Sequence, residues 1–510
     1  SHGKQSKFRQ DPGLLAGVLF CPPDFRGPAR RGRGEGALAG PPCAFYSTCT
    51  NSDWIFSQKV ENLVNILTMG KNVIRFKVLK GKPGGAAPLH PREMPRCKNM
   101  KEERAITMGK SNFGSMDFIA SREGSNTMAV DVIPIPGASI KEGFSKIPMW
   151  VADMNVPTYE NIPAAIIERA KQPHYGYFYQ PKEYFDAIIN WQRTQNGVEG
   201  LLPEHIGYEN GVLGGVVSAL NVFCSRGDKV LVLSPTYVGF TSSLENNGYH
   251  IIHSALKKDD AGVWRMDYAD MEEKIVQHKI HATIVCSPHN PCGRVWERWE
   301  LEQAMELFRK HDVMVVSDEI WSDLTLPGYQ HIPTQSVSPD AKNRTIALYA
   351  PSKTFNLAGL VGSYHIVYNK MLRERLEKES SLSHYDEMNV LSMHALTGAY
   401  TAEGRQWLCE LREVIASNVD YVCDFFAREL PGVTCAKPQG TYMLFVDCAG
   451  YAQAHGVSIA DILKRGWDVG IGWQDGRPFH GPCHIRLNLA LPHTLVEEAC
   501  KRMKQYVFCD

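Results

Sequence analysis

Short apolar segments alternate with stretches of helical periodicity from about residue 116 to the end of this chain. Four segments rich in β-branched residues are expected to form buried strands, at 229–233, 282–286, 313–317 and 345–349. Between two of them, residues 299–311 carry apolar side chains at helical spacing. A repeat of strand, helix and strand predicts an α/β fold around a mostly parallel sheet, in which ligands bind beyond the carboxyl ends of the strands.

Polar residues follow three of the predicted strands. Asn290 lies in the turn after 282–286, Asp318 comes directly after 313–317, and Lys353 follows 345–349. Taken singly, each residue has an ordinary explanation, as a turn residue, a helix N-cap or a solvated lysine. At successive strand ends, however, the three side chains are expected to meet at one edge of the sheet.

A glycine-rich turn at 210–215, at the start of an earlier predicted helix, completes a combination that suits pyridoxal 5′-phosphate (PLP). A lysine amine binds the cofactor aldehyde, and an acid keeps the pyridine nitrogen protonated. The exposed N–H groups of a helix N-terminus receive a phosphate. The residues therefore favour a PLP enzyme.

Eight motifs, in a fixed order, carry a resemblance to a known family. They are PMWVADM at 148–154, HYGY at 174–177, SPTY at 234–237, NPCGRVW at 290–296, DEIWSD at 318–323, SKTFNLAGL at 352–360, GTY at 440–442 and IRLNLA at 485–490. With them, residues 116–510 resemble the fold-type I PLP enzymes of aminotransferase class I and II, in particular the carbon–sulfur lyases of the cystathionine β-lyase type. The resemblance implies a large PLP-binding domain at 160–395 and a small α+β domain made of 116–159 and 396–510, linked by a helical stretch at 396–430.

The same resemblance implies roles around the cofactor ring. Lys353 is expected to bind the cofactor covalently and to move protons, while Asp318 pairs with the pyridinium nitrogen. Tyr237 is expected to stack on the ring, and Asn290 to donate to its phenolic oxygen. Tyr237 also fits a plain core aromatic residue.

Further roles concern the phosphate and the substrate. The residues expected at the phosphate are Val212 and Leu213 through their backbone, Ser352, and Tyr177 of a neighbouring subunit, which implies a homodimer. The residues expected at the substrate are Arg486, as a bidentate clamp on its carboxylate, Ala152, through its backbone N–H, and Trp150. Trp150 also fits a core residue, and Arg486 a surface ion pair.

Three positions depart from the family pattern. Ala350 and Val361 stand where many members carry a Ser and an Arg for the phosphate, so another group must replace them. Trp321 stands where ordinary aminotransferases place a Tyr and many carbon–sulfur lyases a His. This last departure argues against a standard aspartate aminotransferase.

The resemblance implies β-elimination from sulfur amino acids, cystathionine or cysteine S-conjugates, giving a thiol, pyruvate and ammonia. Two alternatives stay open. One is a PLP-dependent aminotransferase for aromatic or kynurenine-type amino acids, because both reactions share their first steps. The other is a regulatory binding protein on the same fold. The sequence specifies neither the preferred substrate nor the balance between lyase and transaminase.

Composition narrows the possible partners. The 55 Lys and Arg residues balance 55 Asp and Glu residues, so no overall basic field attracts nucleic acid or a membrane surface. The 14 cysteines show no CxxC and no metal-ligand spacing, which favours a reducing, cytoplasmic location and no metal. Residues 1–115 are basic and rich in Gly and Pro, and are expected to be a largely disordered leader, either a transit sequence or a non-native segment.

Overall fold

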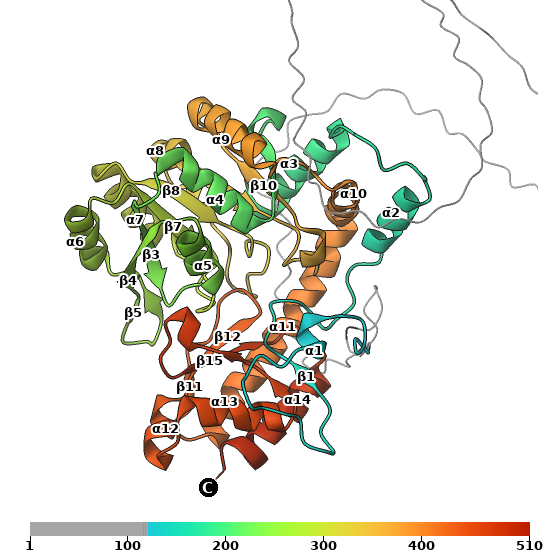
Figure 1. Ribbon diagram of the computed structural model, residues 1–510, viewed down its shortest axis with the longest axis vertical. Coiled ribbons are helices and arrows are strands. Elements are labelled where there is room, and N and C mark those ends of the chain that lie inside the picture. The colour runs from blue at the N-terminus through green and yellow to red at the C-terminus, as the bar shows by residue number, and fades with distance from the viewer. Residues whose placement is uncertain (1–115, 117, 119–120, 510) are drawn as a thin grey trace, which may run out of the picture. The chain divides into compact units, whose positions relative to one another are not determined.

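The largest sheet has seven strands, in the order β2–β10–β9–β8–β7–β3–β4 (Figure 1). Their bounds in the computed structural model are β2 (Ile206–Asn210), β3 (Lys229–Ser234), β4 (His250–Ala255), β7 (Ala282–Cys286), β8 (Met314–Asp318), β9 (Thr345–Tyr349) and β10 (Gly362–Ile366). Five neighbouring strands run parallel, namely β9, β8, β7, β3 and β4. Strand β10 is antiparallel to both of its neighbours, β9 and β2. The structure describes residues 116, 118 and 121–509, so the predictions for 1–115 lie outside it.

Helices cover both faces of this sheet. On one face lie α4 (Val212–Phe223), α5 (Val238–Asn246) and α9 (Lys370–Ser383), and on the other α6 (Tyr268–His278), α7 (Arg298–Lys310) and α8 (Pro339–Arg344). Side chains along β3 alternate between the two faces, and both faces are apolar. Val230 and Val232 pack on the face covered by α4, α5 and α9, and Leu231 and Leu233 on the face covered by α6, α7 and α8. A strand buried on both faces reads as a continuous apolar run, which is what the sequence has there.

A second, smaller sheet is antiparallel, in the order β11–β12–β15–β14. Its strands are β11 (Thr434–Cys435), β12 (Met443–Asp447), β14 (Gln474–Asp475) and β15 (His484–Asn488), and its helices are α12 (Ala449–His455), α13 (Ile459–Asp468) and α14 (His493–Arg502). An earlier segment joins this region, because β1 (Ile147–Pro148) pairs in parallel with β13 (Ile471–Gly472). We propose that the two sheets mark the two domains, with the boundaries expected from the sequence.

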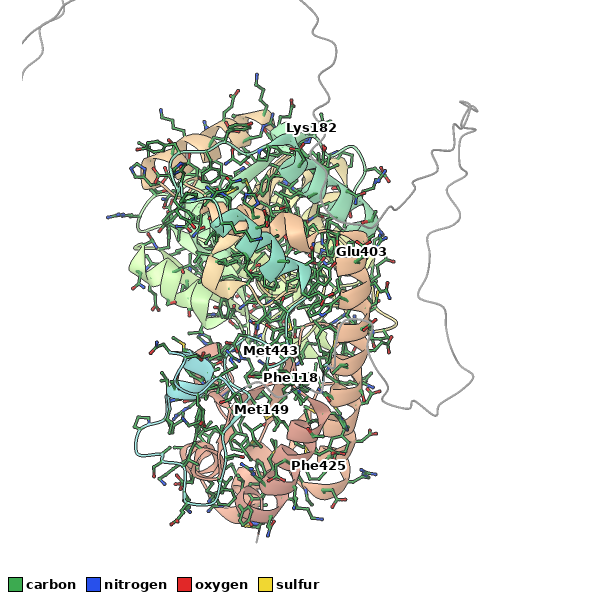
Figure 2. All side chains as sticks on the ribbon, turned by 90° about the vertical axis from the view of Figure 1, so that its right-hand side faces the viewer. Phe118, Met149, Lys182, Glu403, Phe425 and Met443 are labelled. Carbon is green, nitrogen blue, oxygen red and sulfur yellow. The ribbon has the colours of Figure 1, made fainter. Side chains whose placement is uncertain are left out.

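Along the chain, the remaining α-helices come before the first strand of the large sheet or between the last strand of the large sheet and the first of the small one. They are α1 (Met128–Asp131), α2 (Asn161–Ala170), α3 (Lys182–Asn196), α10 (Val390–Ala399) and α11 (Ala402–Glu429). In Figure 2, Glu403 and Phe425 mark the two ends of α11. Lys182 of α3 lies beyond the first end, Met443 of β12 lies near the middle of the helix, and Met149, which follows β1, lies toward the second end. The 28-residue helix thus runs from the large-sheet side to the small-sheet side.

The fold class predicted from the sequence, an α/β fold with a mostly parallel sheet, is confirmed. The strands at 282–286 and 345–349 have the expected bounds, and the one at 313–317 begins and ends one residue later. The helical stretch expected at 396–430 consists of the end of α10 and the whole of α11, with a break at Tyr400 and Thr401 between them. The hydroxyl of Thr401 accepts a hydrogen bond from the N–H of Gly404 at 2.9 Å, so this residue caps a new helix. No helix in the described part of the chain is long and apolar enough to cross a membrane.

Asn418 connects α11 to the end of the small sheet, and its replacement tests that connection. Its fully buried amide donates to the carbonyl oxygens of Leu489 and Leu491, each at 2.9 Å. Asn418→Leu leaves both carbonyls buried without a donor and should lower the free energy of unfolding by about 3 kcal/mol. Urea unfolding followed by circular dichroism measures this, with the exposed neighbour Ser417→Ala as control. Equal stability of the two variants would contradict the assigned role.

Candidate active site

A cavity of about 290 Å³ opens at the carboxyl ends of the parallel strands. The residues predicted for cofactor and substrate that line it are Ala152, Val212, Leu213, Tyr237, Asn290, Asp318, Ser352 and Lys353. The sheet register explains this convergence, because Cys286 of β7 pairs with Asp318 of β8, and Asp318 with Leu348 of β9. The turns that follow β3, β7 and β9 therefore open at the same edge as the end of β8.

Asp318 is the buried acid of the cavity. Only 4% of the residue is exposed, and its carboxylate accepts one hydrogen bond, from the N–H of Ile320 at 3.0 Å. Burial raises its pKa to about 7, which the charge of Lys353 partly offsets. A carboxylate in this position is stabilised by a cation, as the protonated nitrogen of a pyridine ring provides.

Lys353 supplies the amine. Its Nζ donates to the carbonyl oxygen of Ala152 at 2.9 Å, and the hydroxyl of Tyr442 donates to the same oxygen at 3.0 Å. Burial, helped by the positive charge of Arg486, lowers the pKa of Lys353 to about 8, against 10.5 for an ordinary lysine. A much larger fraction of this amine than of an ordinary lysine is therefore neutral, and nucleophilic, near neutral pH.

The first turn of α4 closes one end of the cavity. Gly211 precedes the helix at φ 78° and provides no capping side chain, so the backbone N–H groups of Val212 and Leu213 have no partner within the helix. Ser352 lines the same cavity. N–H groups at a helix start together with a hydroxyl suit a phosphate.

Of the two departures from the phosphate pattern, only one lies at this cavity. Val361, where many members carry an Arg, lines it and brings no charge. Ala350 is buried in the apolar layer beneath α4. Among the lining residues, Lys353 is the one cation, so the phosphate end depends on backbone dipoles and a hydroxyl.

Arg486 reaches the cavity through Asn290. Its Nη1 donates to the Asn290 Oδ1 at 3.0 Å, and its Nη2 to the carbonyl oxygen of Trp150 at 3.3 Å and to the side chain of Gln474. The ring of Phe479 packs on the guanidinium, 4.4 Å from its centroid. Arg486 is only 3% exposed, and its Nε has no partner. A buried guanidinium held by neutral acceptors alone can bind an anion such as a carboxylate.

Tyr237 is placed by the start of α5. Its ring lies in the cavity wall and packs edge-on against Phe240, with centroids 5.4 Å apart. A Cβ on Gly239 would come within 2.3 Å of the Tyr237 ring. The glycine therefore leaves the space that the ring occupies.

Besides Arg486, two predicted residues do not line the cavity. The indole N–H of Trp150 donates to the carbonyl oxygen of Ala129 at 3.0 Å, and the residue borders a separate cavity beside α13. Tyr177 lies fully exposed between α2 and α3. Its neighbour Tyr175 instead contacts its own chain, through the Arg169 guanidinium and the carbonyl oxygen of Ala170.

Several residues of the site received no role from the sequence. Trp321 is buried in the wall, edge-on to Tyr442, with the Lys353 Nζ 5.8 Å from its ring centroid. Asn356 binds the backbone of Met154 through both atoms of its amide, at 2.9 and 3.0 Å. The motifs contain these residues, but their partners lie too far away along the chain to be read from spacing.

The chain belongs to the family of aminotransferase class I and II, whose model matches residues 153–503. This confirms the family prediction. Cystathionine β-lyase PatB of Bacillus subtilis is 34% identical over 361 residues, which cover 70% of this chain and 92% of PatB. Protein MalY of Escherichia coli is 30% identical, over 69% of this chain and 89% of MalY.

A solved structure shows the same fold. The PLP-bound C-S lyase from Staphylococcus hominis matches with a TM-score of 0.69 and 30% identity, over 76% of this chain and 97% of that chain. The fold-type I prediction is therefore confirmed as well.

The lowered pKa of Lys353 predicts how the apoprotein reacts with PLP. Since the neutral amine is the reactive form, the rate of covalent capture should rise with pH through about 8 and then level off. The initial rate of the cofactor's absorbance change, measured from pH 6 to 10.5, checks this, with Lys353→Ala as the unreactive control. A rate that keeps rising toward 10.5, the value of an ordinary lysine, would contradict the burial argument.

Proposed function

We propose that this protein is a PLP-dependent carbon–sulfur lyase, which cleaves the bond between Cβ and sulfur in amino acids such as cystathionine or cysteine S-conjugates. The observation that carries the proposal is the meeting of the Lys353 amine, the buried Asp318 carboxylate and the start of α4 in one cavity. The names of the relatives PatB and the Staphylococcus hominis C-S lyase support the reaction type.

The residues of the cavity fit PLP. The start of α4 and Ser352 would hold its phosphate, Asp318 its ring nitrogen, Tyr237 its ring face and Lys353 its aldehyde carbon. The Oδ1 of Asn290 already accepts from Arg486, so its amide N–H is the part that can donate to the phenolic oxygen. Bound there, PLP would supply an electron sink for the charge that develops at the substrate Cα.

The chain's own residues then bind the substrate and move its protons. Arg486, with its unpartnered Nε, would hold the carboxylate and so fix the direction of the Cα–H bond. The neutral amine of Lys353 is the base that takes the Cα proton. The thiolate leaves from Cβ, and hydrolysis of the remainder gives pyruvate and ammonia.

Trp321 supports the proposal against a standard aspartate aminotransferase. Its indole fills the position where aminotransferases place a tyrosine, so no phenol hydroxyl lies there to bind the cofactor oxygen. The Lys353 Nζ donates a hydrogen bond to the Ala152 carbonyl, which orients the amine. The carbonyl carries no charge and has no proton to exchange with the amine.

A homodimer forms part of the proposal. Tyr177 is fully exposed in its own chain, and a hydroxyl from a second copy would add to a cradle that lacks a cation at Val361. The phosphate would then be held by two subunits.

The decisive assay uses L-cystathionine and the PLP-loaded protein without any 2-oxo acid. We expect equal amounts of pyruvate and free thiol, and no product from Lys353→Ala, because the base is absent. Turnover only after addition of a 2-oxo acid would replace the lyase with an aminotransferase. Failure of the protein to bind PLP at all would favour a regulatory binding protein.

Arg486→Lys tests the carboxylate clamp. A lysine cannot form the bidentate pair, so kcat/KM for cystathionine should fall about 100-fold, mainly through KM. Arg477→Lys is the matched control, because this half-exposed arginine pairs with Asp475 at 2.7 Å and should leave kcat/KM unchanged. Equal losses in the two variants would refute the role of Arg486.

Tyr177→Phe tests the shared phosphate site. Loss of a hydrogen bond to a charged group should raise the PLP dissociation constant about tenfold, while Tyr179→Phe, in the same exposed segment, should not. Sedimentation of the active protein should give a dimer. An active monomer with unchanged PLP affinity in Tyr177→Phe would contradict the proposal.

A further inference from the structure

Two cysteines outside the candidate active site lie in contact. Cys423 of α11 and Cys435 of β11 are 12 positions apart, and their Sγ atoms are separated by 3.6 Å. Both side chains are partly exposed, and both are free thiols. Formation of a disulfide would bring the two sulfurs from this distance to about 2.05 Å.

Cys435 lines another cavity, of about 390 Å³, which is distinct from the candidate active site and from the cavity beside α13. Lys258 of β5 (Lys257–Lys258) and Trp264 of β6 (Trp264–Arg265) line it, with the Lys258 Nζ 4.8 Å from the Trp264 ring centroid. Lys437 lines it too and pairs with Asp420 at 2.6 Å. A small anionic molecule that enters here therefore meets cationic side chains beside a thiol.

The surroundings make Cys435 the more acidic of the two thiols. The hydrogen bond with Cys423 lowers the pKa of Cys435 against the opposing effect of burial, and the charge of Lys258 lowers it further. The same contact raises the pKa of Cys423. Cys292 lines the same cavity, but complete burial raises its pKa. Of the two contacting cysteines, Cys435 is the one that lines the cavity together with Lys258, so its thiolate, the nucleophile in thiol–disulfide exchange, is the one that an entering disulfide meets.

We propose that Cys423 and Cys435 form a thiol–disulfide exchange site that takes small anionic disulfides from the cavity lined by Lys258. The Cys435 thiolate attacks one sulfur of the disulfide, forms a mixed disulfide and releases one thiolate. Cys423 then attacks the Cys435 sulfur and releases the second. In total, two protein thiols become one disulfide, the small disulfide is reduced to two thiols, and the two protein protons pass to these leaving groups.

The disulfide links the last turns of α11 to β11. Because β11 pairs with β12 through Cys435 and Val446, the bond fastens the long helix to the edge of the small sheet. Closing a loop of this length restricts the unfolded chain, so the oxidised protein should melt at a higher temperature than the reduced one.

The experiment treats the PLP-loaded full-length protein with oxidised glutathione, then blocks the remaining thiols and maps disulfides by peptide mass spectrometry. We expect a peptide that joins Cys423 to Cys435. Cys423→Ser should stop at a glutathione adduct on Cys435, and Cys435→Ser should give neither product. Free alkylation of both residues in the wild type, or an adduct on Cys423 at the wild-type rate in Cys435→Ser, would overturn the proposal.

Charge recognition has its own test. Lys258→Gln should slow the reaction with oxidised glutathione about tenfold relative to the reaction with the neutral bis(2-hydroxyethyl) disulfide. The ratio of the two rates separates steering from any change in thiol pKa, which acts on both. Lys257→Gln is the matched control, because this neighbour pairs with Asp267 and does not line the cavity. An unchanged ratio in Lys258→Gln would refute the anionic specificity.

Discussion

Burying charged groups at one edge of a parallel sheet is the constraint on which the rest of the structure depends. Asp318 and Arg486 are almost fully buried, and removing such charges from water is expensive unless partners are fixed around them. The large sheet supplies the acid and the lysine, because its parallel strands end together. The small sheet supplies the arginine, from β15. The site therefore exists only where the two sheets are held in a defined relation.

The segment at 150–154, which contains neither helix nor strand, holds them in that relation. Side chains from both sides satisfy its backbone: Arg486 binds the carbonyl of residue 150, Asn488 those of 151 and 153, and Lys353 that of 152. Asn356 binds both backbone groups of residue 154. A buried loop needs such partners, because an unpaired backbone group costs as much as a lost hydrogen bond. The same contacts that satisfy this loop place the amine and the guanidinium.

Much of this arrangement could be predicted from the sequence, because it depends on residues that are close together along the chain. Apolar β-branched runs fix the strands, and in a parallel sheet a strand's last residue fixes where Asp318 and Lys353 must lie. The roles of Tyr442 and Gln474 could not be predicted, since each acts on a partner from another part of the chain, the Ala152 carbonyl or Arg486. The helix break at Thr401 was missed for another reason, because a capping threonine in an otherwise helical pattern gives only a weak signal.

The phosphate end shows how fold and assembly become linked. A phosphate carries more negative charge than the start of one helix compensates, since its dipole amounts to about half a unit charge. In this chain Val361 brings no cation there; its backbone takes a φ of 60°, and the residue lies close to Gly211 at the start of α4. The remaining donors are backbone N–H groups and Ser352, which orient a phosphate but add no net charge. On the proposed function, the additional donor comes from a second copy through Tyr177, so cofactor retention depends on dimerisation.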